Sequence, residues 1–337
     1  MVNHSGQFGR VGKLFSSVFE AADAVQVYVS EIPRTHCRAK AEGDKGNAKA
    51  GSIRVHADSR GGTVYNERVR LCASWREDAG RKASRQERRQ WRIDQAIREA
   101  EQAESQKRED REAAAIASEI LRVCRSVGEH PYLKRKRIKP TDTMFEVDAS
   151  IVDRVLMSRG IRNEKGEAYR TGLRGRLLVL PLKRGSDDVA SLQFIDAAGR
   201  KLFMKSGRIA EAFWLSHPLE AYQAAGVIGI AEGMATARSV ELVKGFPCVA
   251  AMSSGNLRNV ARYWANHMPD KRFVILSDVG NGEKDAERAA SDIGAQCFKP
   301  PINDEVIRRF RAETGGDGMP TDWNDFYIAT GDLKNEQ

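Results

Sequence analysis

The sequence predicts an α/β domain with a Rossmann-like parallel sheet in its C-terminal third. Three short apolar runs carry this prediction, and each is followed by a helical pattern: VIGIA (227–231), PCVAAM (247–252) and FVILS (273–277). Such continuous runs are typical of strands that are buried on both faces. Their alternation with helices indicates a parallel sheet rather than an antiparallel one.

Two different segments are expected before this domain. Residues 53–76 hold apolar residues in short runs broken by SRGG and NE, which predicts a small antiparallel β unit. From Ser84 to about Arg125 the chain contains no Gly or Pro and is rich in Glu, Arg, Gln and Ala, which predicts one or two long helices. Their thin apolar stripe favours a solvated spacer with i,i+4 ion pairs, and a helix that contacts DNA or a partner is the alternative.

Four segments are therefore expected. The stretch between the charged helix and the parallel sheet contains two strand patterns, LLVLPL (177–182) and ASLQFI (190–195), joined by a turn. The expected segments are a β-containing module at 1–83, a charged helical linker at 84–129, a strand-rich subdomain at 130–225 and the α/β domain at 226–337.

The overall charge points to polyanionic partners. The chain has 337 residues, a formal net charge of +9 and 41% apolar residues. A basic balance favours nucleic acid first among such partners. No window holds about 18 consecutive apolar residues, and the N-terminus lacks the pattern of a signal peptide, so we expect a cytoplasmic protein without a membrane span.

The cysteines do not have the spacing of a zinc ribbon. There are five, and no CxxC pair occurs among them. Reduced thiols are the preferred interpretation. A zinc site that combines His36, Cys37, His56 and Cys72 is the alternative.

Basic residues cluster in two places where phosphate contact is expected. The stretch HPYLKRKRIKP (130–140) includes Lys134, Arg135, Lys136 and Arg137. Its charge density suits nucleic-acid backbone contact, and a solvated hinge between flanking prolines is the alternative. Further on, Lys205 and Arg208 are candidates to hold a triphosphate or a template phosphate, or are simply exposed charges.

Two carboxylates fall directly after predicted strands. Glu232 follows the run at 227–231 and Asp278 follows the run at 273–277. In an open parallel sheet, ligands bind beyond the carboxyl ends of the strands, so both acids are expected at one edge. Paired carboxylates suit Mg²⁺, a hard cation that shares oxygen ligands with phosphates, and phosphoryl transfer is the chemistry that this allows. The alternative is that either acid only caps a turn or a helix.

Other polar groups are candidates for the same edge. Ser253, Ser254 and the Asn256 amide precede a helix, which predicts either an anion site or simple capping. Asp322 and Asp325 in PTDWNDFY form either a third acidic cluster beside the site or a closed turn.

The order of these motifs resembles the Toprim family of primases, type IA and II topoisomerases and related nucleases. The similarity is greatest to the Toprim primases of phages and mobile elements. It covers residues 130–330, and residues 53–92 resemble the family's N-terminal module only loosely. The motifs that carry it are EGMATA (232–237), GNL (255–257), DVG (278–280), NGEKDA (281–286) and DWND (322–325).

The resemblance implies a DNA primase that acts on single-stranded DNA with nucleoside triphosphates, together with a separate replicative helicase. It implies Glu232 and Asp278 as the catalytic pair, with Glu232 as general acid/base, and Glu232, Asp278, Asp322 and Asp325 as the residues around Mg²⁺ or Mn²⁺. The family's second metal-binding aspartate falls where this chain has Gly280. A Toprim nuclease and a catalytically degenerate nucleic-acid-binding protein are the alternatives.

Overall fold

The computed structural model describes residues 9–33, 35–56, 60–77, 85–185, 188–280 and 282–331. The chain divides into two compact units, residues 1–98 and 99–337, which are described separately below. No helix in the described ranges is long and apolar enough to cross a membrane. The division into two units does not test the four segments expected from the sequence, which remain a prediction.

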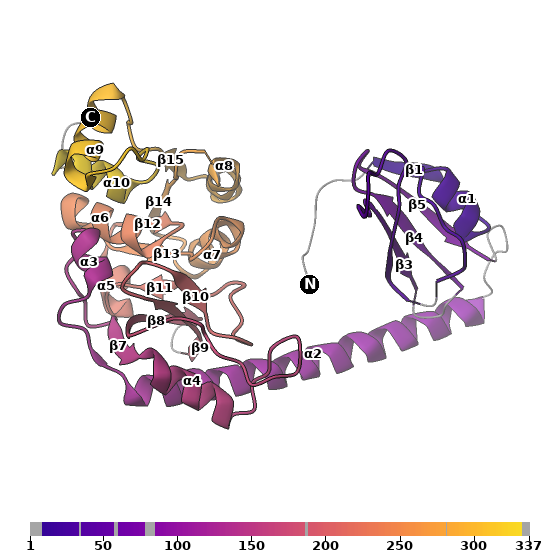
Figure 1. Cartoon of the computed structure of the whole chain (residues 1–337), viewed down its shortest axis with the longest axis horizontal. Helices are drawn as coiled ribbons and strands as arrows, with labels where there is room; N and C mark the ends of the chain where they lie inside the picture. Colours follow the sequence, from indigo (N-terminus) through magenta and orange to yellow (C-terminus); the bar gives the residue numbers. More distant parts are fainter. Residues whose placement is uncertain are drawn as a thin grey trace. The chain divides into compact units, whose positions relative to one another are not determined.

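The first unit is a five-stranded sheet with one short helix, α1 (Val18–Asp23), packed on it (Figure 1). The strands run in the order β1-β5-β4-β3-β2, and β1 is parallel to β5 while the other pairs are antiparallel. The expected β-containing module is confirmed. The strand bounds are β1 Gly9–Phe15, β2 Cys37–Ala39, β3 Gly51–Val55, β4 Gly61–Asn66 and β5 Leu71–Arg76.

The zinc alternative receives no support from this sheet. Cys37 lies on β2 and Cys72 on β5, and two other strands separate β2 from β5. Across the described ranges, no three His, Cys, Asp or Glu side chains lie close enough to share a metal ion.

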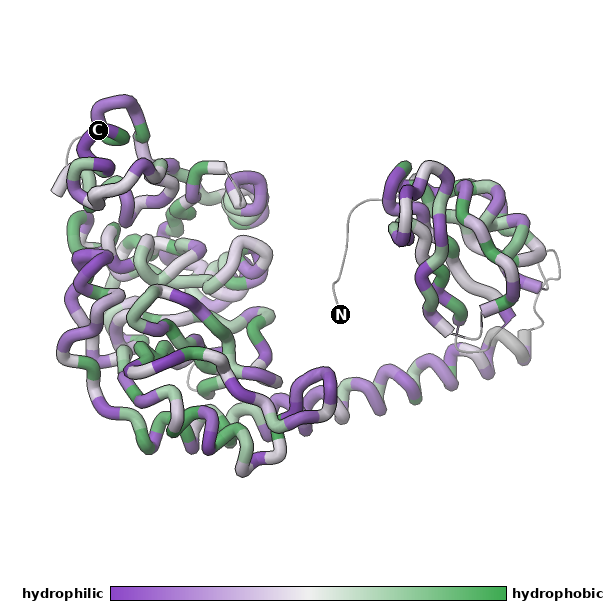
Figure 2. The backbone as a smooth tube through the Cα atoms, in the orientation of Figure 1, coloured by the Kyte–Doolittle hydropathy of each residue, from purple (hydrophilic) through white to green (hydrophobic). Residues whose placement is uncertain are grey.

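The long charged helix is confirmed as one element, α2 (Arg85–Val123). Figure 2 shows that its first half is mainly hydrophilic. Its last turns are different, because Ala113, Ile116, Ala117 and Ile120 are buried in the core of the second unit. Their spacing places them on one face of the helix. The interpretation as a solvated spacer therefore fails for this end of α2.

The second unit begins with an antiparallel sheet in the order β10-β9-β8-β7-β6. The strands expected at 177–182 and 190–195 are β8 and β9. The last turns of α2 pack against this sheet together with α4 (Ala149–Ser158), whereas α3 (Pro131–Arg135) contributes to the core shared with the next sheet. The strand bounds are β6 Arg125–Ser126, β7 Phe145–Asp148, β8 Arg176–Arg184, β9 Asp188–Ile195 and β10 Lys201–Phe203.

The predicted parallel sheet is the C-terminal part of this unit, in the order β11-β13-β12-β14-β15. Strands β13, β12, β14 and β15 are parallel, and only the edge strand β11 is antiparallel. The strand bounds are β11 Trp214–Leu215, β12 Val227–Ala231, β13 Cys248–Ala250, β14 Arg272–Leu276 and β15 Gln296–Phe298.

Helices cover both faces of this sheet, as expected for strands that are apolar on both sides. One face packs against α6, α9 and α10, and the other packs against α7 and α8 (Figure 1). The predicted α/β fold is confirmed. The helix bounds are α5 Leu219–Ala224, α6 Met234–Lys244, α7 Ser254–His267, α8 Glu283–Ile293, α9 Asp304–Thr314 and α10 Trp323–Thr330.

Candidate active site

Glu232 and Asp278 lie at the carboxyl ends of two neighbouring strands. Glu232 directly follows β12, and Asp278 lies two residues beyond the end of β14. These strands are hydrogen-bonded partners in register, with Ala231 opposite Leu276. The two carboxylates therefore emerge at the same edge of the sheet, where an α/β fold binds its ligands.

The start of α10 brings a third acid to this edge. The Val279 backbone N–H donates to the Thr321 carbonyl at 2.7 Å, which holds the segment after β14 against the residue before Asp322. Asp322 is the N-cap of α10, and its carboxylate accepts the Asp325 N–H at 2.7 Å. A cap of this kind leaves further lone pairs of the carboxylate for another ligand.

Crowding of these acids makes the edge electrostatically unfavourable when it holds no cation. Burial raises the pKa of Asp278 to about 7, with further contributions from Asp322, Glu232 and Asp325. Burial also raises the pKa of Glu232 and of Asp322. Asp278 Oδ1 is buried and accepts no hydrogen bond from the described residues. An unpaired buried oxygen among like charges is stabilised by a nearby cation.

Asp325 forms an ion pair with Lys136 within the fold. Its Oδ1 accepts from Lys136 Nζ at 3.2 Å, and its Oδ2 accepts the Thr321 N–H at 3.0 Å. The neighbouring Asn324 amide donates to the Lys136 carbonyl at 2.7 Å. Burial alone would lower the pKa of Lys136, but Asp322 and Asp325 outweigh it and the pKa is raised. Lys136 therefore stays charged, and a role for Asp325 as metal ligand remains only a prediction.

Lys201, on β10, is a site residue that the sequence did not single out. Its positive charge lowers the pKa values of Glu232, Asp278 and Asp322, in each case against a larger effect of burial. It is exposed, and its ammonium lies 5.7 Å from the centre of the Tyr132 ring. One sign of this role was present in the sequence, because Lys201 lies in the GRKLFMKSG stretch upstream of the parallel sheet.

The basic run at 134–137 is folded onto the body of the unit. It forms the end of α3, which His130 caps and whose Tyr132 is buried. Arg135 donates to the Ala197 carbonyl at 2.8 Å, and Arg137 donates to the Ile328 carbonyl at 3.1 Å and pairs with Glu313. The alternative of a free hinge is therefore not what the structure shows. Nucleic-acid contact by this run stays a prediction, and Lys134 is among its exposed members.

The remaining predicted phosphate ligands have partners within the chain. Lys205 Nζ lies 6.0 Å from the centre of the Tyr169 ring, and Arg208 Nη1 donates to Asp110 at 3.2 Å. At the start of α7 the Ser254 N–H lowers the pKa of the nearby Glu232 carboxyl, against the larger effect of burial. The anion at this helix N-terminus is thus Glu232 itself, with Ser253 as the N-cap residue.

The loop after Asp278 depends on two glycines with positive φ. Gly280 has φ +91° and an added Cβ would meet nothing within 4 Å. Gly282 has φ +92°, and an added Cβ would lie 2.9 Å from Glu232 Oε2 and 3.0 Å from Ser254 Cβ. Gly282 therefore allows Glu232 and the start of α7 to approach the loop closely.

We expect Gly280→Asp to raise divalent-metal affinity. The added carboxylate has free space, and a second anionic oxygen tightens a hard cation held by few protein ligands. The chain does not continue as an extended strand here, and the left-handed conformation costs about 1 kcal/mol for a residue other than glycine. The gain in affinity is therefore expected to be about tenfold or less. Titration of Mn²⁺ into both proteins measures it, and an unchanged affinity in a folded variant would show that residue 280 does not face the cation.

The acids at this edge fit a partly hydrated Mg²⁺ or Mn²⁺ ion. Mg²⁺ is usually held by one or two carboxylates, waters and substrate phosphates rather than by a closed protein cage. Asp278 and Asp322 would supply hard oxygen ligands with Glu232 at the same edge, and the buried, unpaired Asp278 Oδ1 favours a cation there. No three His, Cys, Asp or Glu side chains of the described ranges lie close enough to share one ion, so the protein would supply fewer than three of the ligands directly.

Comparison with known proteins agrees with this geometry. Residues 227–332 match the family described as Toprim domain. A DNA primase TraC of Escherichia coli is 27% identical over 278 residues, which cover 78% of this chain and 24% of that protein. A second DNA primase TraC of Escherichia coli is 26% identical over 275 residues, which cover 78% of this chain and 17% of that protein. The chain thus spans about a quarter or less of the curated relatives that it matches.

Solved primase structures are distant in comparison. The zinc-binding and RNA polymerase domains of the Aquifex aeolicus primase match 93% of this chain and 80% of their own, with 12% identity and a TM-score of 0.44. The primase fragment of the bacteriophage T7 primase-helicase matches 40% of this chain and 56% of its own, with 13% identity and a TM-score of 0.31.

Proposed function

We propose that this chain, whose residues 227–332 are a Toprim domain, is a DNA primase of the mobile-element type that joins nucleotides on a single-stranded DNA template. The observation that carries the proposal is the convergence of Glu232, Asp278 and Asp322 at one sheet edge, with Asp278 Oδ1 buried and unpaired. The TraC proteins to which the chain is similar are named DNA primases.

Each residue has a defined role in this reaction. Asp278 and Asp322 would hold the divalent cation, which would neutralise negative charge on the transferring phosphate and on the pyrophosphate that leaves. Glu232 accepts the proton from the attacking hydroxyl, because burial raises its pKa and makes it a stronger base than an exposed glutamate. Lys201 adds a positive charge beside the acids, where an incoming triphosphate is stabilised.

The wider set of partners belongs to the same proposal. Nucleoside triphosphates bind next to Lys205, whereas Arg208, the other basic residue expected there, is paired with Asp110 and Glu211. Single-stranded DNA contacts the basic run at 134–137. A separate replicative helicase supplies the template strand, and the protein acts in the cytoplasm, where DNA of phages and plasmids is replicated.

Gly280 favours a second candidate, a catalytically degenerate Toprim protein that binds nucleic acid without reacting. One acid of the resembling primases is missing, and the open space beside Gly280 is not filled by another carboxylate among the described side chains. A Toprim nuclease is the third candidate, because the same acids would also support hydrolysis of a phosphodiester.

One assay separates these candidates. The full chain is incubated with mixed single-stranded templates, labelled nucleoside triphosphates and Mg²⁺ or Mn²⁺, and the products are resolved by length. A primase makes short new strands, a nuclease shortens the template, and a degenerate protein does neither. Glu232→Gln should reduce synthesis by about 100-fold or more, because general acid/base groups contribute at least this much. Synthesis that survives in this variant would refute the assigned role of Glu232.

We expect single-stranded DNA binding to weaken when Lys134 and Lys139 are both changed to Ala. Both side chains are exposed, whereas Lys136 and Arg137 support the fold and are poor test positions. Loss of two phosphate contacts should lower the slope of log affinity against log salt by about 1.4. Fluorescence anisotropy at several salt concentrations measures this slope. The exposed pair Lys107 and Lys165, changed to Ala, is the matched control, and equal slopes in both variants would exclude a specific role for the basic run.

A further inference from the structure

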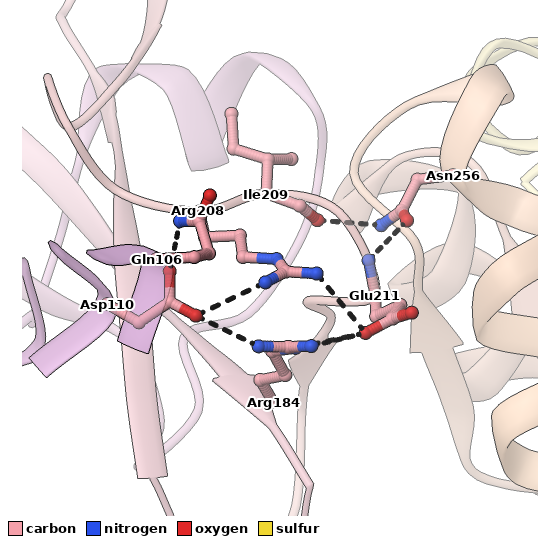
Figure 3. A network of polar contacts seen from close by, with 7 residues as sticks. All are labelled: Gln106, Asp110, Arg184, Arg208, Ile209, Glu211 and Asn256. Atoms are coloured by element: carbon pink, nitrogen blue, oxygen red, sulfur yellow. Dashed lines mark hydrogen bonds and ion pairs between the residues drawn. The ribbon is translucent and has the colours of Figure 1, made fainter. Parts of the chain in front are cut away.

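Asn256, at the start of α7, connects three segments through one buried side chain. It is 4% exposed. The two N–H groups of its Nδ2 are shared among the carbonyls of Ile209, Ala212 and Ala251, which lie at 3.1, 2.7 and 2.8 Å. Its Oδ1 accepts the Glu211 N–H at 2.8 Å, and Figure 3 shows the contacts with Ile209 and Glu211. The whole hydrogen-bonding capacity of the amide is thus used within the chain. This side chain holds the fold together and has no donor left for a ligand.

The backbone on both sides of this amide is strained. Glu211 has φ +66° and Met252 has φ +70°, a region that residues other than glycine rarely adopt. Glu211 bonds directly to Asn256, and Met252 follows Ala251, another of its partners. Strained backbone of this kind persists only where the surroundings enforce it, and it gathers around functional sites. Asn256 is the group that enforces it here.

A cluster of four charges anchors the same loop to α2. Arg184 donates to the Glu211 carboxylate through Nε at 3.1 Å and Nη2 at 2.6 Å. Asp110 of α2 accepts from Arg184 and Arg208, each at 3.2 Å, and both guanidinium groups lie between the two carboxylates (Figure 3). The Lys183 and Phe213 backbones also bond to each other, which ties the end of the loop to β8.

Glu232 lies at the other end of this series of contacts from Asp110. Asn256 fixes the first turn of α7, and Ser254 in that turn lies close to the Glu232 carboxylate, because a Cβ added to Gly282 would lie 2.9 Å from Glu232 Oε2 and 3.0 Å from Ser254 Cβ. Hydrogen bonds thus run from Asp110 on α2 through Arg184 and Glu211 to Asn256, and close approach at Gly282 brings the first turn of α7 next to Glu232. A displacement of about 1 Å at such an acid costs orders of magnitude in rate.

We propose that the loop 208–212 is a brace that holds the first turn of α7 against Glu232, with Asn256 and Glu211 as positioning residues and Asp110 as the far anchor. The effect on catalysis rests on the function proposed above, whereas the mechanical role does not. The paired arginines are balanced by Asp110 and Glu211, so their charges serve to hold the loop.

Hydrogen exchange tests the mechanical role without any activity. The amides of residues 253–257 should exchange about tenfold faster in Glu211→Gln and in Asp110→Asn than in the wild type, because each change loosens the brace locally. Amides in α9 should be unaffected in both variants. Glu104→Gln is the matched control, because Glu104 forms an exposed ion pair with Arg111 on the same helix α2.

Steady-state kinetics test the catalytic consequence. In both variants kcat of primer synthesis should fall about tenfold with an unchanged KM for nucleotides, because the geometry of Glu232 changes and not the substrate contacts. Unchanged exchange of residues 253–257 in folded Glu211→Gln and Asp110→Asn would overturn the brace. A raised KM with an unchanged kcat would also overturn it, since Arg184 and Arg208 would then contact the substrate. If the wild type makes no primers, the proposed function fails and the exchange result alone decides the brace.

Discussion

Asp278→Asn is expected to abolish primer synthesis and, in the absence of metal, to make the protein more stable. Synthesis should fall about 1,000-fold, because the main oxygen ligand of the cation is lost. Stability should rise because Asp278 is held among like charges, and burial together with these charges raises its pKa to about 7. Asparagine has nearly the same shape but no charge, so the variant avoids the electrostatic cost of ionising a buried carboxyl beside other acids.

The pH dependence follows from the direction of this shift. In the unfolded chain the carboxyl ionises near its ordinary pKa, 3.8, whereas in the folded protein it ionises at about 7. The favourable contribution of the protonated group is therefore complete below about pH 4 and is lost as the pH rises through about 7. Because Asp278 is partly exposed, we expect the advantage of Asp278→Asn to grow from near zero at about pH 4 to about 2 kcal/mol at about pH 8.

Urea unfolding in EDTA at several pH values measures this difference in the free energy of unfolding. Addition of Mn²⁺ at about pH 8 should stabilise the wild type but not the variant, since a ligand stabilises only the state that binds it. Asp292→Asn is the control, because Asp292 forms a surface ion pair with Arg258 and its pKa is lowered. If Asp278→Asn were less stable than the wild type at every pH, the ionised Asp278 carboxylate would not be destabilised by burial and by its acidic neighbours.

The sequence was sufficient to predict the parallel sheet and the placement of its two acids. Continuous apolar runs report burial on both faces, and residues directly after such runs must lie at the carboxyl edge. Glu232 and Asp278 therefore followed from local pattern alone. Asp322 followed only from the family resemblance, because its approach depends on the contact between Val279 and Thr321, which are distant in the sequence.

Neither the ion pairs nor the brace could be predicted from local sequence patterns. Lys136 and Asp325 lie 189 residues apart, and nothing in either segment signals that they meet. Asn256 was read as an anion ligand or a cap because a polar residue at a helix start is typical of both. The core face of α2 did not stand out because two of its four buried positions, Ala113 and Ala117, are alanines, which weakens the apolar periodicity.

Gly282→Ala is expected to remove activity by displacing Glu232, while Gly280→Ala is not. Both glycines have nearly the same positive φ, so alanine costs about 1 kcal/mol of stability at either position. They differ in their surroundings. At Gly282 the new Cβ would lie 2.9 Å from Glu232 Oε2 and 3.0 Å from Ser254 Cβ, whereas at Gly280 it would meet nothing within 4 Å.

The carboxylate is the part that gives way at Gly282, because it is the flexible end of a side chain. It would then move away from Ser254 and from the sheet edge, so we expect synthesis to fall about 100-fold. Thermal unfolding and the primer assay on both variants separate the two effects. Similar losses of stability with a large loss of synthesis only in Gly282→Ala would establish that the close approach at Gly282 positions Glu232. Equal activity in the two variants would show instead that Glu232 acts from another position than the one seen here.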